Sequence, residues 1–173
     1  SPSDLPDFFE SNNAKEIIEW LYKQQQSVVL LASGDALWFG IGRQLLEHFP
    51  KNKLSFYPSP TSLQLAFSKL KIPWHEAQWV SLHGRDPDPL KTLLQKRVKI
   101  IGILTDPKRE GPEEVRNFLK ALEIESSYQF WLFEKLGDSE ESCKLINPSQ
   151  PILQDIDPLN LVVLVHEKKS KIN

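Results

Sequence analysis

The chain has 173 residues, of which 40% are hydrophobic and 25% are charged, and its formal net charge is −2 at pH 7. This balance is typical of a globular protein with a buried core. The charge gives no general basic surface for nucleic acid, so any anionic ligand requires a local cluster of Arg and Lys. No apolar run approaches the roughly 20 residues that span a bilayer, and no basic-then-apolar leader is visible. We therefore expect neither a nucleic-acid nor a membrane partner.

The numbers of cysteines and methionines indicate the redox setting of the chain and whether it has been processed. Cys143 is the only cysteine, which excludes an internal disulfide and a cysteine-rich zinc site and favours a reducing, cytoplasmic setting. The histidines have no spacing that indicates metal ligands, so we expect no metal. The sequence contains no methionine and begins with Ser1, which favours a fragment or a processed chain.

Residues 28–43, VVLLASGDALWFGIGR, are the stretch around which we expect the fold to be organised. Residues 28–32 form an uninterrupted apolar run, typical of a central strand that is covered on both faces in a parallel sheet. A polar turn at residues 33–35 follows, and the next apolar residues recur at helical spacing. In open α/β sheets, ligands bind beyond the carboxyl ends of strands, which is where this turn would lie.

A second strand-turn-helix unit follows. Residues 53–57 alternate as a short strand, and the hydroxyl-rich turn PSPTS ends it. Thr61 followed by Gln64 predicts a capping box at the start of a helix. If the two strands are parallel, both turns lie at the same edge of the sheet. Before the first unit, residues 14–23 predict a helix.

The rest of the chain continues the α/β pattern. Residues 79–82 predict a strand that ends at residues 83–85, and the Asp-Pro-Asp-Pro segment at 86–89 continues neither strand nor helix comfortably. We therefore predict two α/β lobes, residues 1–85 and 86–173. In the second lobe we expect helices at 90–95 and from Pro112, and strands at 100–104, 128–133, 144–146 and 161–165.

Four segments, in this order and spacing, resemble the tetrapyrrole methylase family: SGDALWFGIGR, PSPTSLQLAFSKL with the following IPW, VSLHGR, and LTDP. The resemblance covers residues 28–165 and is strongest to the branch that methylates C5 of a corrin precursor. The family's turn usually reads Ser-Gly-Asp-Pro, whereas this chain has Ala36 at the proline position. Family members also open with a strand and a Gly-rich loop, after which this chain is expected to start.

The resemblance implies a two-lobed α/β fold that binds S-adenosyl-L-methionine between the lobes. It implies methylation at C5 of a corrin-ring precursor of the precorrin-6Y or precorrin-7 type, in cobalamin biosynthesis. It also implies a homodimer, and a fused or separate domain that methylates C15 and decarboxylates. Methyl transfer from a sulfonium chiefly requires alignment and exclusion of water, so no elaborate catalytic machinery is expected.

The cofactor-binding residues that we expect on this basis lie in the turns after strands. Asp35 could accept hydrogen bonds from the amino or ribose groups of the cofactor, or it could simply cap the following helix. The Thr61 hydroxyl could bind the cofactor or serve only the capping box, and the turn after residue 104 could be a plain turn closed by Pro107. The full predicted set is Ser33, Gly34, Asp35, Leu37, Thr61, Ser62, Leu104, Thr105 and Leu136.

The predicted substrate-binding residues are His83, Gly84 and Arg85. An Arg side chain can hold a substrate carboxylate in bidentate fashion, and corrin precursors carry several acetate and propionate groups. His83 is also the candidate catalytic residue, because its imidazole could take a proton from the methylated carbon. The alternative is that His83 is an ordinary loop residue and Arg85 a solvated charge.

Two other functions stay open at this stage. The chain could be a non-catalytic module that binds a tetrapyrrole or a protein partner with the same fold. It could also be a generic nucleotide-binding α/β protein, although it lacks a G-x-G-x-x-G segment.

Overall fold

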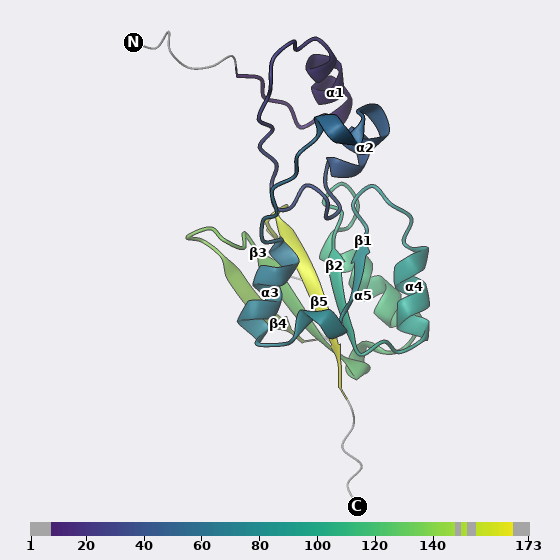
Figure 1. Cartoon of the computed structure of the whole chain (residues 1–173). Helices are drawn as coiled ribbons and strands as arrows, with labels where there is room; N and C mark the ends of the chain where they lie inside the picture. The colour runs from purple at the N-terminus through teal and green to yellow at the C-terminus, as the bar shows by residue number, and fades with distance from the viewer. Residues whose placement is uncertain (1–7, 148–149, 152–154, 168–173) are drawn as a thin grey trace, which may run out of the picture. The chain divides into compact units, whose positions relative to one another are not determined.

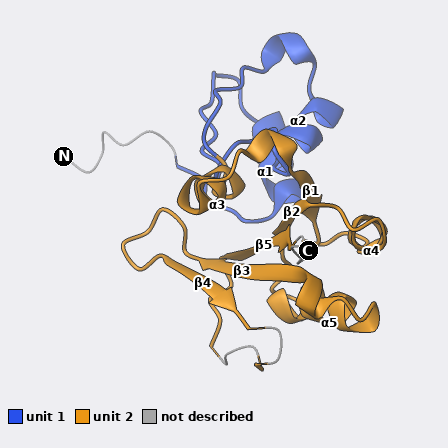
Figure 2. Cartoon of the chain, turned by 90° about the horizontal axis from the view of Figure 1, so that it is seen from below, with its two compact units in different colours: residues 1–60 blue, residues 61–173 orange. Residues whose placement is uncertain are grey.

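The structure is a computed structural model that describes residues 8–147, 150–151 and 155–167. The chain forms two compact units, Ser1–Pro60 and Thr61–Asn173 (Figure 2). Within the described residues, none of the helices has the length and apolar character needed to cross a bilayer.

Unit 1 contains two short helices, α1 (Ala14–Tyr22) and α2 (Gly42–His48). The side chain of Asn13 caps α1 by accepting a hydrogen bond from the Lys15 amide (3.0 Å), which confirms the predicted helix. The Tyr22 hydroxyl donates to the carbonyl of His48 (2.9 Å). This bond joins the end of α1 to the end of α2.

The central strand predicted at residues 28–32 is wrong for unit 1 as the structure describes it. These residues are extended but belong to no sheet, and Val29 and Leu31 are 85% and 86% exposed. An apolar run becomes a buried strand only where neighbouring strands cover it. Residues 8–60 contain no strand that could do so.

Two further predictions for unit 1 are corrected. Residues 51–53 form a 3-10 turn and residues 54–57 are extended without a strand partner, so the strand predicted at 53–57 is absent from this described region. The helix expected directly after the turn begins only at Gly42. Phe39 has a φ of 50°, a left-handed conformation that a right-handed helix cannot contain.

Unit 2 is built on a mixed five-stranded sheet with the order β1-β2-β5-β3-β4 (Figure 1). β5 lies between β2 and β3 and is antiparallel to both. β1 is parallel to β2, and β4 is antiparallel to β3. The strands predicted here are confirmed, with ends that shift by at most two residues: β1 Gln78–Ser81, β2 Ile100–Leu104, β3 Tyr128–Glu134, β4 Ser142–Ile146 and β5 Asn160–His166.

Helices cover both faces of this sheet, which confirms the α/β architecture. α3 (Ser62–Leu70) packs on one face against β2 and β5. α4 (Asp88–Gln95) and α5 (Pro112–Ala121) contribute to the core on the other face, and Figure 2 shows α3 and α5 on opposite sides of the sheet. That core includes Leu90, Leu94, Ile101, Ile103, Val115, Leu119, Leu132 and Leu164.

The two units divide between Pro60 and Thr61, whereas the sequence predicts a lobe boundary between residues 85 and 86. The predicted boundary falls in the loop between β1 and α4, inside unit 2. β1 and β2 lie on either side of it in the sequence and pair within one sheet. As a functional division, residues 1–85 and 86–173 stay a prediction.

Gly102 allows α3 to pack closely on the sheet, and this gives a test of the core. A Cβ added at Gly102 would lie 2.8 Å from Cε3 of Trp79 and 3.0 Å from Cδ2 of Leu63. We expect Gly102→Ala to lower the free energy of unfolding by about 1–3 kcal/mol, because overpacking forces both neighbours to move. Urea unfolding measures this, with Ser68→Ala on the exposed side of α3 as the control. Equal stability of the two variants would contradict the packing described.

Candidate functional site

The carboxyl ends of three strands meet at one edge of the sheet in unit 2. Because β5 is antiparallel to both β2 and β3, strands β1, β2 and β3 all run in the same direction. The loops that leave this edge begin at residues 82, 105 and 135. They contain six of the predicted site residues or flank them directly: His83, Gly84, Arg85, Leu104, Thr105 and Leu136.

The carboxylate of Asp106 joins two of these loops. It is 4% exposed and accepts hydrogen bonds from the Gly84 amide (2.9 Å) and the Lys108 amide (2.9 Å). The Gly84 hydrogen bond is the main reason that the pKa of Asp106 lies below its ordinary value, and it outweighs the opposing effect of burial. The loop after β1 is therefore fastened to the loop after β2.

The hydroxyl of Thr105 is engaged in the fold. It donates to Oδ1 of Asn160 (2.6 Å), at the start of β5, and lies 3.2 Å from the Asn160 carbonyl oxygen. Asn160 in turn donates from Nδ2 to the carbonyl of Asp157 (2.7 Å). The neighbouring Leu104 is only half-buried. A ligand at this position would meet the Leu104 side chain more readily than the Thr105 hydroxyl.

The capping box predicted at Thr61 is confirmed. The Thr61 hydroxyl accepts from the Gln64 amide (3.2 Å), and the Gln64 side chain accepts from the Thr61 amide (2.8 Å). Thr61 is buried, whereas Ser62 is exposed. Of the two hydroxyls predicted to bind the cofactor, that of Thr61 already has a structural role and that of Ser62 faces solvent.

The turn that carries Leu136 is tied to α3. Lys69 of α3 forms an ion pair with Glu141, whose second carboxylate oxygen accepts from the Gly137 amide (3.1 Å). A Cβ added at Gly137 would lie 3.7 Å from Cδ1 of Leu65 in α3. These contacts tie the turn that contains the half-buried Leu136 to α3 at Leu65 and Lys69.

Glu134 is a second buried carboxylate at the same edge. Burial raises its pKa, but hydrogen bonds from the Asp157 amide (2.9 Å), the Lys144 ammonium (3.1 Å) and the Ser142 hydroxyl (3.1 Å) outweigh it and leave the pKa below its usual value. Sequence analysis did not single out Glu134. Its signal is a charged residue in the last position of an apolar strand.

The predicted site residues of unit 1 are Ser33, Gly34, Asp35 and Leu37, and Asp35 organises them. Its Oδ1 accepts from the Leu37 amide (2.8 Å) and its Oδ2 from the Ser59 amide (3.1 Å). The SGDA turn is therefore bonded to the main chain at Ser59 within unit 1. Asp35 caps a turn and not α2, and each of its oxygens retains a lone pair for another donor.

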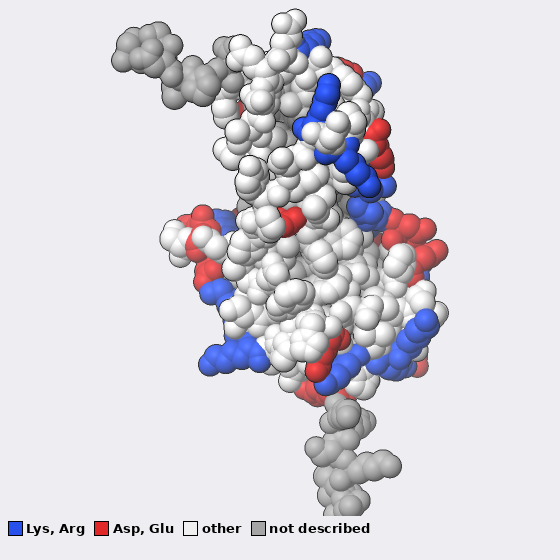
Figure 3. Space-filling model, in the orientation of Figure 1, with Lys and Arg blue, Asp and Glu red and all other residues white. Residues whose placement is uncertain are grey.

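Charged residues lie at the margins of one face of unit 2. On the side shown in Figure 3, the face of unit 2 around α3 is largely uncharged, and Lys, Arg, Asp and Glu gather at its margins.

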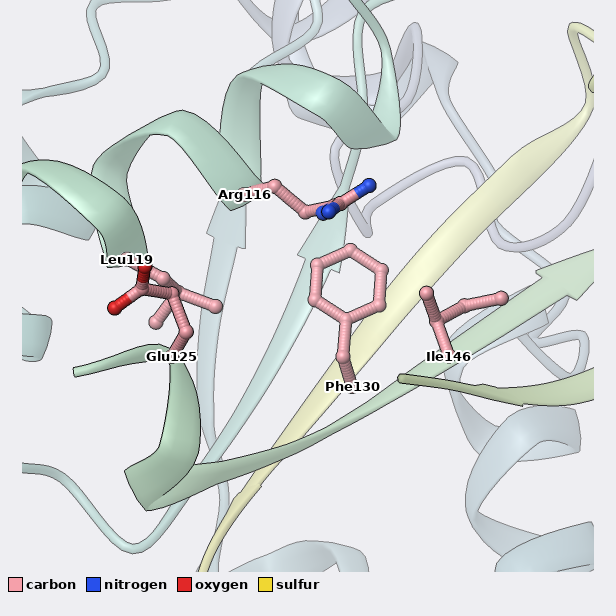
Figure 4. A pocket seen from close by; sticks show the side chains of 5 residues that line it. All are labelled: Arg116, Leu119, Glu125, Phe130 and Ile146. Atoms are coloured by element: carbon pink, nitrogen blue, oxygen red, sulfur yellow. The ribbon is translucent and has the colours of Figure 1, made fainter. Parts of the chain in front are cut away.

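A pocket beside α5 is lined by Arg116, Leu119, Glu125, Phe130 and Ile146, with the Arg116 guanidinium near the Phe130 ring (Figure 4). It contains none of the predicted site residues.

The sequence also matches a known protein family. The family model described as Tetrapyrrole (Corrin/Porphyrin) Methylases matches residues 3–145. The chain belongs to the tetrapyrrole methylase family. This confirms the resemblance inferred from the four sequence motifs.

Curated tetrapyrrole methylases similar to this chain come from bacteria and archaea. The chain is 27% identical to precorrin-6Y C(5,15)-methyltransferase [decarboxylating] of Sinorhizobium sp over 150 residues, which are 87% of this chain and 36% of the relative. It is 28% identical to cobalt-precorrin-7 C(5)-methyltransferase of Salmonella typhimurium over 106 residues, 61% of this chain and 51% of the relative. The chain thus spans about a third to a half of the length of these two relatives.

Solved structures show the same fold. The precorrin-6Y methylase cbiE from Archaeoglobus fulgidus matches with a TM-score of 0.60 and 20% identity, over 94% of this chain and 74% of that chain. The uroporphyrin-III C-methyltransferase of Thermus thermophilus, complexed with S-adenosyl homocysteine, matches with a TM-score of 0.67 and 21% identity, over 87% and 72%. At these identities the likeness establishes the tetrapyrrole methylase fold alone.

The bonds of Asp106 predict a pH-dependent loss of stability in Asp106→Asn. Asn has a single acceptor oxygen, so one of the two main-chain hydrogen bonds is lost and the other is weakened, and we expect the variant to lose about 1–3 kcal/mol of unfolding free energy at neutral pH. Because the folded-state pKa is lowered, the stabilisation from Asp106 is complete above the unfolded value and is lost as the pH falls below 3.8 toward the folded-state pKa.

Denaturant unfolding at a series of pH values checks this prediction. The difference between wild type and Asp106→Asn should be constant above about pH 5 and should shrink below pH 4. Asp86→Asn is the matched control, since Asp86 is exposed and accepts only from the Asp88 amide (2.9 Å) among the bonds described. A difference that persists undiminished in acid would show that the Asp106 charge is not responsible.

Proposed function

We propose that this chain is a methyltransferase, or the methylating part of one, that transfers a methyl group from S-adenosyl-L-methionine to C5 of a corrin-ring precursor in cobalamin biosynthesis. The observation that carries the proposal is the match of residues 3–145 to the tetrapyrrole methylase family. The names of the two curated relatives, which act at C5 of a precorrin, support the choice of acceptor.

The sheet edge of unit 2 carries apolar and hydroxyl groups of the kinds that can contact an adenosine group. Leu104 and Phe133 both lie opposite Leu161 of β5, so β2 and β3 are two strand spacings apart, about 10 Å. β5 lies between these two strands, Leu104 and Leu136 are each partly exposed at their carboxyl ends, and Ser62 offers an exposed hydroxyl. When bound, S-adenosyl-L-methionine supplies a methyl group activated by the positive charge on its sulfur.

The turn around Asp35 carries the predicted cofactor contacts of unit 1. The remaining lone pairs of the Asp35 carboxylate can accept hydrogen bonds from amino or hydroxyl groups. Gly34 has a φ of +68° and no atom within 4 Å of an added Cβ, so a ligand can approach its main chain closely. The roles of Ser33, Gly34, Asp35 and Leu37 stay a prediction.

The loop after β1 is proposed to bind the acceptor. His83, Gly84 and Arg85 are exposed on a turn whose main chain is fixed by Asp106. Arg85 would hold a carboxylate of the corrin precursor, and His83 would accept the proton released from the methylated carbon. The protein's remaining task is to align donor and acceptor and to exclude water.

Three further expectations remain predictions. They are a homodimeric assembly, a cytoplasmic location, and a fused or separate domain that methylates C15 and decarboxylates.

Isothermal titration calorimetry with S-adenosylhomocysteine tests the cofactor proposal. We expect saturable binding, and we expect Leu136→Ser to weaken it about fivefold, because part of a leucine contact with the adenine is lost. Leu145→Ser on β4 is the control, since Leu145 is 53% exposed and lies outside the proposed site.

The absence of binding heat in both the 173-residue chain and the product of its complete reading frame would overturn the cofactor proposal. Binding without methyl transfer to a corrin precursor would instead favour a non-catalytic tetrapyrrole- or partner-binding module. Equal weakening by Leu136→Ser and Leu145→Ser would remove Leu136 from the site.

Methyl-transfer kinetics test the substrate role of Arg85. We expect Arg85→Gln to raise KM for the corrin precursor about tenfold with little change in kcat, because one charge-assisted contact contributes roughly 1.5–3 kcal/mol. Arg97→Gln makes the same charge change at the opposite edge of the sheet, next to the amino end of β2, and should leave KM unchanged. A similar rise in both variants would indicate a general charge effect and contradict a specific contact.

A further inference from the structure

The loop after β1 is a tight turn that presents two exposed side chains. The Arg85 amide donates to the carbonyl of Leu82 (3.1 Å), which closes a four-residue turn. Gly84 occupies the third position with a φ of +59°, a conformation that favours glycine. His83 and Arg85 are both exposed on this turn. The main chain of the turn therefore sets the positions from which both side chains extend.

One guanidinium group holds both ends of this turn. Arg109 donates from Nη1 to the carbonyl of Arg85 (2.9 Å) and from Nη2 to the carbonyl of Leu82 (2.7 Å). The two nitrogens are fixed in one plane, so a single side chain sets the separation of the two carbonyls. A lysine ammonium is a point donor and does not reproduce this fork.

Arg109 is itself held in place by two carboxylates. Its Nε donates to Oε2 of Glu114 (3.2 Å) and lies 3.8 Å from Oδ2 of Asp106. The side chains of Glu114 and Asp106 are 13% and 6% exposed. Asp106 also accepts from the Gly84 amide, so the turn is fastened at its middle by the carboxylate and at its two ends by the guanidinium.

We propose that Arg109 is a positioning residue for acceptor recognition: it fixes the turn of residues 82–85 and thereby aims His83 and Arg85. This inference rests on the proposed function for its catalytic consequence, whereas its structural part stands independently. In this proposal Arg109 acts on the turn and not on the acceptor, because each of its three nitrogens already donates to the turn or to Glu114.

The test compares Arg109→Lys and Arg109→Gln with the control Lys108→Gln. Lys108 is the adjacent exposed cation, and only its main-chain amide contributes to the turn's anchoring. Glu114→Gln is the second variant, since it weakens the anchor of Arg109 while leaving the guanidinium present. Thermal unfolding first confirms that each variant is folded.

Amide hydrogen exchange provides a readout that needs no substrate. We expect exchange at Arg85 and Gly84 to be about tenfold faster in Arg109→Lys and Arg109→Gln, a few-fold faster in Glu114→Gln, and unchanged in Lys108→Gln. Unchanged exchange in both Arg109 variants would overturn the proposal, because the turn would then be held without Arg109.

Methyl-transfer kinetics and calorimetry provide the functional readout. We expect Arg109→Lys to lower kcat/KM for the corrin precursor about tenfold while the affinity for S-adenosylhomocysteine stays within about twofold of wild type. A loosened turn with unchanged kcat/KM would overturn the positioning role. If wild type itself transfers no methyl group, the proposed function fails, and the hydrogen-exchange result still decides whether Arg109 fixes the turn.

Discussion

Strand β5 determines the arrangement of unit 2 because it is antiparallel to the strands on both of its sides. β2 and β3 must therefore run in the same direction, and β1 follows β2 because the two pair in parallel. This constraint gathers the loops after three strands at one edge, although they come from segments separated by up to about fifty residues. The predicted ligand-binding positions of unit 2 are neighbours for this reason and not because they are close in sequence.

Several polar side chains at this edge form hydrogen bonds with main-chain groups. Asp106, Arg109 and Glu134 each bind at least one backbone amide or carbonyl of another loop or turn. Asp106 and Glu134 are buried, where a hydrogen bond to a charged group contributes more than at the surface, whereas the Arg109 side chain is 35% exposed. The edge therefore has a defined main-chain shape without help from the side chains that would meet a ligand.

The elements of unit 2 could be predicted because each carries a local signal. The run at Ile100–Leu104 and the capping box of Thr61 and Gln64 were both correctly assigned. Residues 28–32 carry the same apolar signal as β2 but are exposed, because burial depends on covering segments that residues 8–60 do not supply. The prediction of a central strand was wrong because an apolar run alone does not show whether other segments cover it.

The candidate site also combines features that a local sequence pattern predicts with contacts that it does not predict. Strand ends identified residues 83–85 and 104–105 and the turn at Leu136, since a strand end is a local feature. The bonds of Arg109 to Arg85 and of Thr105 to Asn160 join residues 24 and 55 positions apart, which no local pattern reveals. The nearest signal that the sequence offers is the Asp106-Pro107 pair, which one residue separates from the buried strand β2 and one residue from Arg109.

The turn at residues 82–85 has a consequence for how such an enzyme can diversify. Its backbone is secured by groups outside the turn, and within it only Gly84 is demanded by conformation. The conformation of the turn therefore does not depend on which side chains stand at positions 83 and 85. Evolution can exchange these two side chains, which are the proposed contacts with the acceptor, without having to rebuild the scaffold.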